Sequence, residues 1–341
     1  METSDGTGPT DATDTSDATE LTDATETSDP PSNVHGTFDQ ELTHDGQTRE
    51  FIVYVPESAV GTTPAPVVLM FHGTAQDGKF FADQGTWQAV ADTEGIIVVW
   101  PTALHHCYLK DDDKDGQFTD AAVSTKWANS DDGHVDVFPI CPPEVIANLD
   151  EPKKSRADHP LADDVGFVDA MLSTLQANLA IDAKRVYATG FSNGSGFVLR
   201  LMGQRSGVFA AFASNAGSPV AEPAPDAVPR SLWWTVGSKD SKVFGPTAEG
   251  PDGVPMKEEL MSTPALKAKF TDPVLPLMQL ADEYTFKEQQ NEGLNIITWT
   301  WAKSTGDASN TLTFNLVEDQ GHTYPEYTPM VLWNFFKDQS L

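Results

Sequence analysis

The stretch RVYATGFSNGSGFVLR, residues 185–200, joins an apolar run, a glycine-rich turn and a helical pattern in immediate succession. Residues 186–188 are the apolar run expected of a buried strand, and the apolar positions after the turn recur at helical spacing. Between them, residues 190–194 read G-F-S-N-G, a G-x-S-x-G motif. On so tight a turn the serine hydroxyl is exposed at the carboxyl end of a sheet, and flanking side chains would clash with strand and helix. We predict a nucleophile elbow at Ser192; a glycine-rich loop that matches by chance is the alternative, which the flanking strand and helix disfavour.

Composition narrows the classes of protein to which the chain can belong. Of its 341 residues, 39% are hydrophobic, enough to bury a sizeable core. The formal net charge is -30, and 42 acidic against 21 basic residues remain after the nine acids of residues 1–33 are set aside. So acidic a chain repels phosphate, and it has no basic patch and no nucleic-acid motif. No apolar run approaches the roughly 20 residues of a membrane span. We expect no nucleic-acid partner, no anionic membrane partner and no transmembrane segment.

Residues 1–35 are an acidic linker rich in Thr and Asp. They cannot bury enough apolar surface to offset chain entropy, so we expect disorder. Such a tract is typical of a solvated tether between an export or lipid anchor and a folded domain. The acidic tract begins directly after Met1, without the apolar stretch of a signal peptide. We expect a secreted or surface-tethered protein whose signal is absent from this sequence; a cytosolic protein with an acidic tail is the alternative.

Residues 36–341 show strand and helix patterns in alternation, which we interpret as one domain. Asp45-Gly46 between two alternating runs predicts a β-hairpin. Strands that alternate with helices predict a mostly parallel sheet with helices on both faces. Further strands are expected at 66–71, 96–101, 209–216, 231–237, 297–304 and 311–319, and helices at 80–93, 163–179, after the elbow, and at 329–338.

Residues 102–160 interrupt this rhythm and read as a functional insertion, because they are too long for a simple connection. They contain the two cysteines of the chain, Cys107 and Cys141, which we predict to form a disulfide in a secreted protein; buried thiols would be the default in a cytosolic one. Trp127 in the same stretch is placed near an aromatic or sugar ring of a substrate. Packing of a lid is the alternative for this indole.

Asp111, Asp113, Asp115 and Gly116 give D-x-D-x-D-G, the first half of a calcium-binding loop of the EF-hand kind. Position 12 of that loop would be Ala122 rather than the bidentate glutamate. A solvated acidic loop is therefore the competing interpretation. We expect no required cofactor and keep structural calcium at this loop as a hypothesis.

A serine hydroxyl needs a base to take its proton, and the base needs an acid to orient it. In a nucleophile-elbow protein the order along the chain is Ser, acid, His. His322 is the one histidine after Ser192, and it follows the last predicted strand. Asp240 is the preferred acid because it lies three residues after the buried run 232–237, with Asp272 as the runner-up. We predict that Ser192, Asp240 and His322 form a catalytic triad.

The oxyanion of a tetrahedral intermediate needs backbone N–H donors. We predict two: the amide of Asn193, directly after the nucleophile, and the amide of Thr74, after His72-Gly73 at the end of an inner strand. His72 precedes the serine, so we interpret it as a residue that shapes this turn and not as the triad base.

The order of VVLMFHGTAQDG, GIIVVWPTAL, DDVGFVDAMLSTLQANLAIDAKRVYATGFSNGSG and GHTYP along the chain resembles the polyhydroxybutyrate depolymerase and feruloyl/acetylxylan esterase family, the carbohydrate esterase family 1 branch of the α/β-hydrolases. The resemblance covers roughly residues 48–240 and the last thirty or so. It implies an α/β-hydrolase fold and places the family's nucleophile on Ser192, its acid on Asp240 and its base on His322. It also implies secreted, cofactor-free hydrolysis of esters of plant cell-wall sugars or of polyesters.

The chain departs from that family in two places. The insertion at 102–160 is longer than usual, and residues 243–290 lack the short turn common there. Both are expected around the cleft, so they bear on the identity of the substrate.

The sequence thus predicts a secreted, monomeric serine carboxylesterase that works through an acyl-enzyme. Feruloyl or acetyl esters of plant cell-wall polysaccharide are the first substrate class, and polyesters are the second. A peptidase of the same fold is a further alternative, since triad chemistry serves esters and amides alike. A non-catalytic binding protein would need a broken triad, whereas each member is present here.

Overall fold

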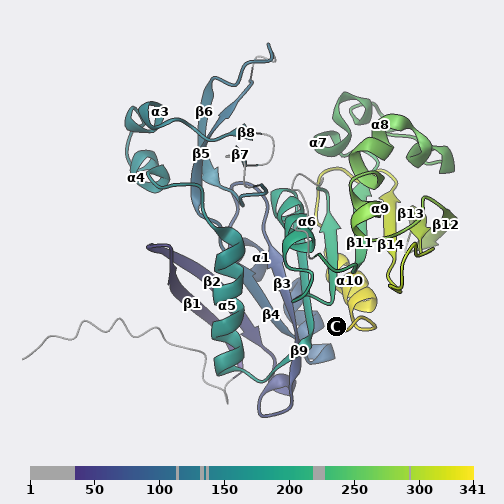
Figure 1. Ribbon diagram of the computed structural model, residues 1–341, viewed down its shortest axis with the longest axis horizontal. Helices are drawn as coiled ribbons and strands as arrows, with labels where there is room; N and C mark the ends of the chain where they lie inside the picture. The colour runs from purple at the N-terminus through teal and green to yellow at the C-terminus, as the bar shows by residue number, and fades with distance from the viewer. Residues whose placement is uncertain (1–34, 113–114, 131–133, 136–137, 218–226, 292) are drawn as a thin grey trace, which may run out of the picture.

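The computed structural model describes residues 35–112, 115–130, 134–135, 138–217, 227–291 and 293–341. Asp113 and all but the last residue of the linker 1–35 lie outside these residues. The described chain is built on a ten-stranded sheet in the order β1-β2-β4-β3-β9-β10-β11-β14-β13-β12 (Figure 1). Among the helices of this described part, none combines the length and the apolar character that crossing a membrane would take.

The predicted hairpin opens the sheet. Strands β1 (Gly36–His44) and β2 (Gln47–Val55) pair antiparallel in continuous register. Their two-residue turn, Asp45 and Gly46, has φ of 49° and 73°. Both values are left-handed, which matches the twist of the strands and suits an Asp-Gly pair. The hairpin prediction is confirmed.

The centre of the sheet is parallel, as predicted. Strand β2 joins it antiparallel through β4, and β13 and β12 close the far edge antiparallel. The inner strands are continuous apolar runs because both of their faces are covered. The remaining strands of this sheet are β3 (Ala65–Phe71), β4 (Ile97–Pro101), β9 (Ile181–Phe191), β10 (Ala211–Asn215), β11 (Ser231–Gly237), β12 (Tyr284–Asn291), β13 (Leu294–Trp301) and β14 (Leu312–Val317).

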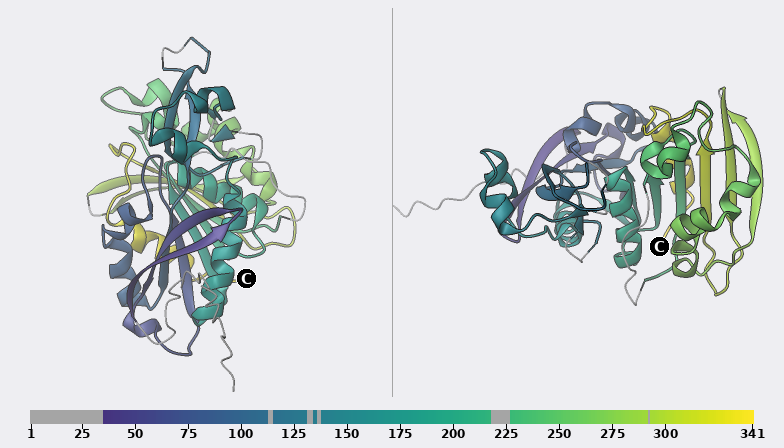
Figure 2. Two further views of the ribbon diagram at one scale, coloured as in Figure 1. Left: turned by 90° about the vertical axis from the view of Figure 1, so that its left-hand side faces the viewer. Right: turned by 90° about the horizontal axis from the view of Figure 1, so that it is seen from above.

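Helices cover both faces of the sheet, as Figure 2 shows. Tyr187 of β9 stacks on Phe336 of α10 (Thr328–Phe336), with ring centroids 4.8 Å apart. On the other face, Phe71 of β3 meets Phe197 of α6 (Asn193–Gln204) edge-on at 5.2 Å. The other helical elements are α1 (Gly78–Ala82), α2 (Thr86–Glu94), α3 (Pro143–Ala147), α4 (Lys153–Ala157), α5 (Asp164–Asn178), α7 (Ser241–Phe244), α8 (Pro264–Leu266), α9 (Val274–Leu277) and the short turns η1 (Glu57–Ala59), η2 (Gly245–Ala248), η3 (Glu258–Ser262) and η4 (Lys267–Thr271).

Two details differ from the sequence prediction. The single helix expected at 80–93 is two helices, α1 and α2, because Gly85 between them has a left-handed φ of 69° that a continuous helix excludes. Residues 243–290, expected as an insertion, hold short helices but also nearly all of β12, the edge strand of the main sheet. The apolar alternation of β12 is weak because an edge strand exposes much of its surface.

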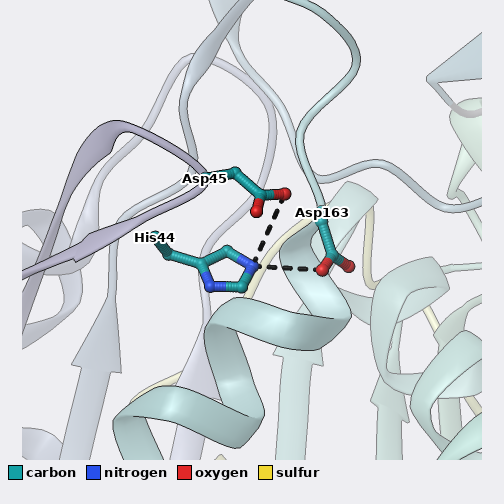
Figure 3. Close-up of side chains that lie close together, drawn as sticks. All are labelled: His44, Asp45 and Asp163. Carbon is teal, nitrogen blue, oxygen red and sulfur yellow. Dashed lines mark hydrogen bonds and ion pairs between the residues drawn. The ribbon is translucent and has the colours of Figure 1, made fainter.

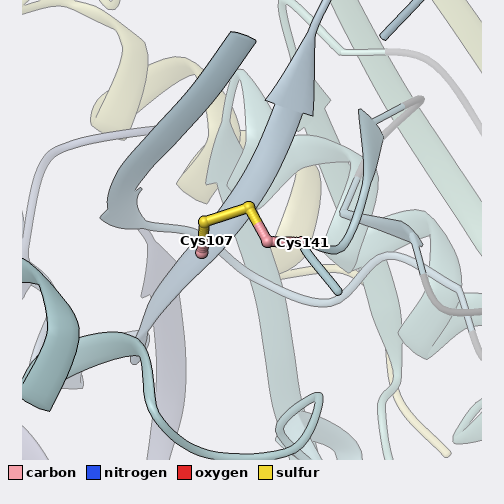
Figure 4. Close-up of a disulfide and its surroundings, with 2 residues drawn as sticks. All are labelled: Cys107 and Cys141. Carbon is pink, nitrogen blue, oxygen red and sulfur yellow. A yellow bond between two sulfur atoms is a disulfide. The ribbon is translucent and has the colours of Figure 1, made fainter. Parts of the chain in front are cut away.

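The stretch 102–160 has its own structure, which stands off the main sheet in Figure 1. It holds a ribbon of β5 (His105–Lys110) and β6 (Asp120–Thr125), a short pair of β7 (His134–Val135) and β8 (Phe138–Pro139), and helices α3 and α4. Cys107 on β5 and Cys141 after β8 form the predicted disulfide (Figure 4). The amide of Cys141 also donates to the carbonyl of Cys107 at 2.9 Å. The disulfide prediction is confirmed.

Removing the disulfide should lower the free energy of unfolding. The two cysteines are 34 residues apart, and closing a loop of that length stabilises a protein by about 3 to 4 kcal/mol through the unfolded chain. We expect a Cys107→Ser/Cys141→Ser variant to lose about that much in urea unfolding. An unchanged midpoint, with the disulfide shown to be intact in the parent protein, would contradict this expectation.

A buried histidine of the insertion should make stability depend on pH. His106 on β5 accepts a hydrogen bond from the amide of Ala162 at its Nε2 (3.2 Å), and burial lowers its pKa from 6.5 to about 4. Between pH 4 and pH 6.5, this histidine therefore binds a proton in the unfolded chain but not in the folded chain. The stabilisation is therefore complete above pH 6.5 and is lost as pH falls toward 4, by roughly 3 kcal/mol.

The variant His106→Gln, whose Oε1 can accept the same hydrogen bond, should lose less stability than the parent between pH 7 and pH 4. Unfolding in urea across that range measures the difference. His35→Gln, which changes an exposed histidine, should keep the parental slope. Equal slopes for His106→Gln and the parent would be the contrary result.

Candidate active site

Strand β9 passes directly into α6 at Ser192, whose backbone has φ 55° and ψ -119°. The backbone of a non-glycine residue is strained at these angles, so surrounding contacts must hold it there. The amide of Ser192 donates to the carbonyl of Asn215 at 2.9 Å, and its carbonyl accepts the amide of Ser195 at 3.0 Å. The predicted strand–turn–helix arrangement is therefore present, with Ser192 at its sharp corner.

The glycines that flank the serine are required by close backbone contacts. A Cβ on Gly190 would lie 2.4 Å from the carbonyl oxygen of Gly194. A Cβ on Gly194 would lie 2.3 Å from the carbonyl oxygen of Phe71, the last residue of β3. Real Cβ atoms do not approach so closely, so any other residue would push the elbow away from β3. The clash predicted from the motif is thus present on both sides of the serine.

The structure brings Ser192, His322 and Asp240 into one hydrogen-bonded chain. His322 follows β14, and its Nε2 lies 2.8 Å from Ser192 Oγ. Its Nδ1 lies 2.9 and 3.0 Å from the carboxylate oxygens of Asp240. The tautomer that satisfies both contacts carries the proton on Nδ1 and accepts the serine hydroxyl at Nε2. In this state the imidazole is ready to take the serine proton.

Asp240 is fully buried and has a second task in the fold. Its Oδ1 accepts the amides of Lys242 and Val243 at 3.0 and 3.1 Å, which caps the short helix α7. These donors and His322 compensate the burial of a charged carboxylate. Asp272, the runner-up acid, is exposed at the end of η4 and is not the carboxylate that faces His322.

Two loops at the ends of β11 and β14 are joined so that acid and base stay together. The amide of Lys239 donates to the carbonyl of Gln320 at 2.9 Å, and the amide of Asp319 donates to Ser238 Oγ at 2.9 Å. A Cβ on Gly237 would lie 2.0 Å from that same Gln320 carbonyl oxygen. The two loops therefore run in direct backbone contact beside the imidazole.

The turn after β3 fixes the peptide that carries the Thr74 amide; its part in an oxyanion hole stays a prediction. The carbonyl of Gly73 accepts His72 Nδ1–H at 2.7 Å and the amide of Gln76 at 3.2 Å. In a trans peptide the N–H points opposite to the carbonyl, so these bonds turn the amide of Thr74 away from His72. Gly73 also lies against the nucleophile, because a Cβ there would be 3.1 Å from Ser192 Cβ.

The amide of Asn193 belongs to the first turn of α6, where the helix dipole favours negative charge. The Thr74 and Asn193 amides thus stand on the two turns that meet at Ser192. An oxyanion formed on a carbonyl attacked by Ser192 would arise between these turns.

His72 has the shaping role expected from its position. It is fully buried, and its Nε2 accepts the amide of Ala103 at 3.0 Å while Nδ1–H donates to Gly73. Burial lowers its pKa to about 4, so the imidazole is neutral around pH 7 and keeps this tautomer.

The placement of Trp127 at a substrate is wrong. Its side chain is fully buried and belongs to the hydrophobic core. The indole stacks on Phe197 with centroids 5.0 Å apart, and its Nε1 donates to the carbonyl of His72 at 3.0 Å. A ring packed between β3 and α6 has no free face for a ligand. Sequence position alone could not show this, because the strand that precedes Trp127 leads back to the core.

Two groups of side chains offer potential metal ligands. His44, Asp45 and Asp163 each bring one donor atom within 4.8 Å of the others (Figure 3). However, Asp163 caps α5 by accepting the amide of Gly166 at 2.9 Å, and its other oxygen faces His44 Nε2 at 3.0 Å. The positive end of the helix dipole also opposes a cation here.

The second group is the acidic loop. Asp111 accepts the amides of Asp115 and Gly116, both at 3.0 Å, while Asp113 lies outside the described residues. Calcium binding at this loop stays a prediction.

Comparisons with known proteins show which proteins this chain resembles in sequence and in fold. No protein-family model matches the chain. A bifunctional acetylxylan esterase/xylanase of Neocallimastix patriciarum is 24% identical over 184 residues, which are 54% of this chain and 20% of that protein. The chain therefore matches about a fifth of the length of this curated relative.

Two solved structures match the chain almost throughout. An acetyl xylan esterase from Aspergillus awamori has a TM-score of 0.52 at 13% identity and covers 88% of this chain and 99% of that one. An S-formylglutathione hydrolase from Agrobacterium tumefaciens has a TM-score of 0.51 at 12% identity, with 89% and 94% covered. The chain has the α/β-hydrolase fold. The fold prediction is confirmed, and the curated relative supports the resemblance to acetylxylan esterases.

Several residues that build this site do not stand out in the sequence. The side chain of Asn193 binds the backbone of Trp127, and the side chain of Gln76 binds the amide of Gly73. The buried pair of Arg49 and Asp164 holds the segment 125–130, which packs on these turns. The sequence does carry a sign of the buried partner of Arg49, because this charged residue occupies a position of β2 that alternation assigns to the core side. Asp164 lies at the start of the helix predicted at 163–179, where a carboxylate is expected in any case, so its pairing with Arg49 leaves no separate signal.

Replacing the acid should separate catalysis from stability. Asn caps helices as well as Asp does, so Asp240→Asn should retain α7, but its amide no longer stabilises the imidazolium and favours the wrong tautomer. We expect kcat for p-nitrophenyl acetate to fall by about 10⁴-fold with a small change in melting temperature. Asp272→Asn is the matched control and should keep parental activity. A loss in Asp272→Asn with activity retained in Asp240→Asn would contradict the assignment.

Proposed function

We propose that this α/β-hydrolase is a serine carboxylesterase that works through an acyl-enzyme. The observation that carries the proposal is the Ser192–His322–Asp240 chain, whose contacts are 2.8 Å and 2.9 Å. This combination of an activated hydroxyl, a neutral imidazole acceptor and a buried carboxylate is the arrangement required for nucleophilic attack on an acyl carbon. The curated relative, an acetylxylan esterase by name, supports the choice of esters over amides.

The proposed reaction follows from the geometry. Ser192 Oγ attacks the ester carbonyl while its proton passes to His322 Nε2, and the carbonyl oxygen becomes an oxyanion between the Thr74 and Asn193 amides. His322 then gives the proton to the departing alcohol, leaving an acyl-serine. A water molecule, deprotonated by His322, attacks the acyl carbon and releases the acid, and the proton returns to Ser192. Asp240 stabilises the imidazolium in both halves.

For the substrate, we propose feruloyl or acetyl esters of plant cell-wall polysaccharide. A cavity of about 640 Å³ has Asp77, three residues along the chain from Thr74, in its lining, whereas Ser192, Asp240 and His322 do not line it. We assign this cavity to the polysaccharide and not to the ester, because most of its lining residues are polar and suit sugar hydroxyls: Asp39, Gln40, Glu41, Glu50, Asp77, Lys79, Thr102, His105 and Thr125, beside Phe51 and Ile52. A polyester chain lacks hydroxyls to satisfy such a surface, so it remains the second candidate.

We also propose that the enzyme is secreted. The disulfide between Cys107 and Cys141 supports this, because such bonds persist in oxidising compartments. The acidic net charge of the chain is compatible with an extracellular enzyme that stays soluble.

Replacing the nucleophile tests the reaction. Ser192→Ala removes the attacking atom, and we expect turnover of p-nitrophenyl acetate to fall to background while the melting temperature stays nearly unchanged. Labelling by a fluorophosphonate, located by mass spectrometry on the peptide that contains Ser192, should be present in the parent and absent in the variant. Activity that persists in Ser192→Ala would sink the proposal.

A substrate panel tests the finer proposal with the parent enzyme. Acetylated xylan and methyl ferulate should be hydrolysed with a higher kcat/KM than polyhydroxybutyrate or an aromatic polyester. Preference for either polyester would replace the polysaccharide proposal with the second candidate, and peptide turnover above ester turnover would indicate a peptidase.

A further inference from the structure

One segment of the insertion, residues 125–130, contacts both turns that meet at Ser192. On the elbow side, Asn193 makes two hydrogen bonds to Trp127: Asn193 Oδ1 accepts the amide of Trp127 at 2.7 Å, and Asn193 Nδ2 donates to its carbonyl at 3.2 Å. Asn129 Nδ2 donates in turn to the carbonyl of Asn193 at 3.3 Å. The residue that offers one oxyanion amide is therefore tied to the 125–130 segment through its side chain and its backbone.

The same tryptophan holds the other turn. Trp127 Nε1–H donates to the carbonyl of His72 at 3.0 Å, and the amide at the far end of that peptide, Gly73 N–H, donates to Gln76 Oε1 at 2.9 Å. Both ends of the 72–73 peptide plane are thus held. The next amide along the chain is that of Thr74, the second oxyanion donor. Its orientation depends on the plane that Trp127 and Gln76 hold.

The indole has little freedom to move between the two turns. Trp127 is fully buried, stacks on Phe197 at 15° between ring planes, and meets the edge of Phe71 at 5.2 Å. Phe71 is the last residue of β3 and directly precedes His72. Phe197 lies on α6, one turn after Asn193. Trp127 therefore acts as a rigid spacer between the strand and the helix that carry the two donors.

The 125–130 segment is itself anchored to the fold. The amide of Ala128 donates to Asp164 Oδ2 at 2.7 Å, and Asp164 Oδ1 accepts Arg49 Nη2 at 2.6 Å. The carbonyl of Ala128 accepts Arg200 Nη1 at 2.6 Å. Since Asp164 and Arg49 are buried, these contacts are protected from solvent. Before Trp127, the amide of Lys126 donates to the carbonyl of Leu104 at 3.1 Å, so the segment is held on both sides of Trp127.

We propose that Trp127 is a positioning residue for the oxyanion hole, which sets the relative position of the Thr74 and Asn193 amides. The inference rests on the proposed esterase function. Main-chain donors stabilise an oxyanion only when they lie about 2.7 to 3.1 Å from it, and a displacement near 1 Å can cost about a hundredfold in rate. Trp127 does not contact the substrate. It acts through the carbonyl of His72 and the side chain of Asn193.

The test compares two buried tryptophans that differ in location. Trp127→Phe keeps an aromatic ring against Phe197 but removes the N–H donor to His72. Trp299→Phe is the matched control, because Trp299 on β13 is equally buried and its Nε1 donates to the carbonyl of Glu258 at 3.0 Å, away from Ser192. Trp127→Phe leaves the carbonyl of the buried His72 without its indole donor, whereas Trp299→Phe leaves the carbonyl of Glu258, an exposed residue, without its own. Both variants should lose melting temperature, and Trp127→Phe should lose more, because an unpaired carbonyl costs more where water cannot reach it.

Catalysis should distinguish the two variants. In Trp127→Phe we expect kcat/KM for p-nitrophenyl acetate to fall about 10- to 100-fold. The inhibition constant of a phenylboronic acid, whose adduct with serine imitates the tetrahedral intermediate, should rise in parallel, because both report stabilisation of the oxyanion. Trp299→Phe should match the parent in both. The proposal is overturned if Trp127→Phe loses no more kcat/KM than Trp299→Phe, or if boronate affinity stays parental.

A second substitution keeps the test decisive if Trp127→Phe does not fold. Incorporation of 3-benzothienylalanine at position 127 retains the bicyclic shape and replaces the indole N–H with a sulfur atom, which cannot donate a hydrogen bond. The same loss of kcat/KM and of boronate affinity is expected, and parental values would overturn the inference. A parent enzyme without Ser192-dependent ester hydrolysis would overturn the proposed function and this inference together. Ser192-dependent hydrolysis that is insensitive to both changes at Trp127 would overturn the inference alone.

Discussion

The close contact between the end of β3 and the elbow is the constraint on which the site depends. At Gly194 the helix backbone approaches the carbonyl oxygens of Phe71 and His72 so nearly that a Cβ would lie 2.3 and 2.4 Å from them. The contact begins at Phe71, where the pairing of β3 with β9 ends, and it extends to His72, which lies beyond that pairing. It brings two turns from distant parts of the sequence together beside Ser192.

Several buried polar groups around this contact hold loops in position. Asp240 is charged and buried, yet two amides and an imidazole surround its carboxylate. Arg49 and Asp164 are buried as a pair, and such pairs seldom add much net stability because desolvation offsets their attraction. Their benefit here is positional, since Asp164 also holds the amide of Ala128. These buried charges therefore position loops more than they add stability.

The parts of this structure that the sequence could predict are those with local signals. Ser192 lies in a motif whose strand and helix flank it directly, and His322 is the one histidine that follows it. Asp240 could be chosen among fifteen acids because it follows a buried strand, where a sheet presents its loops. The weak pattern of β12 and the break at Gly85 escaped prediction, because edge exposure and a single left-handed residue leave little trace in periodicity.

Long-range contacts explain the misplacement of Trp127. A tryptophan in an irregular acidic stretch has the same local signature whether it faces a ligand or the core, and only the return of the chain from β6 to His72 and Asn193 decides between them.

This return also divides the insertion into two parts with different constraints. The outer part, held by the disulfide, contacts its own small cluster around Cys107 and Cys141. The 125–130 segment packs on the catalytic turns, so its backbone and Trp127 are bound to the geometry of the main fold. An insertion of this kind can vary at its outer end without disturbing the site, provided that the inner segment is retained.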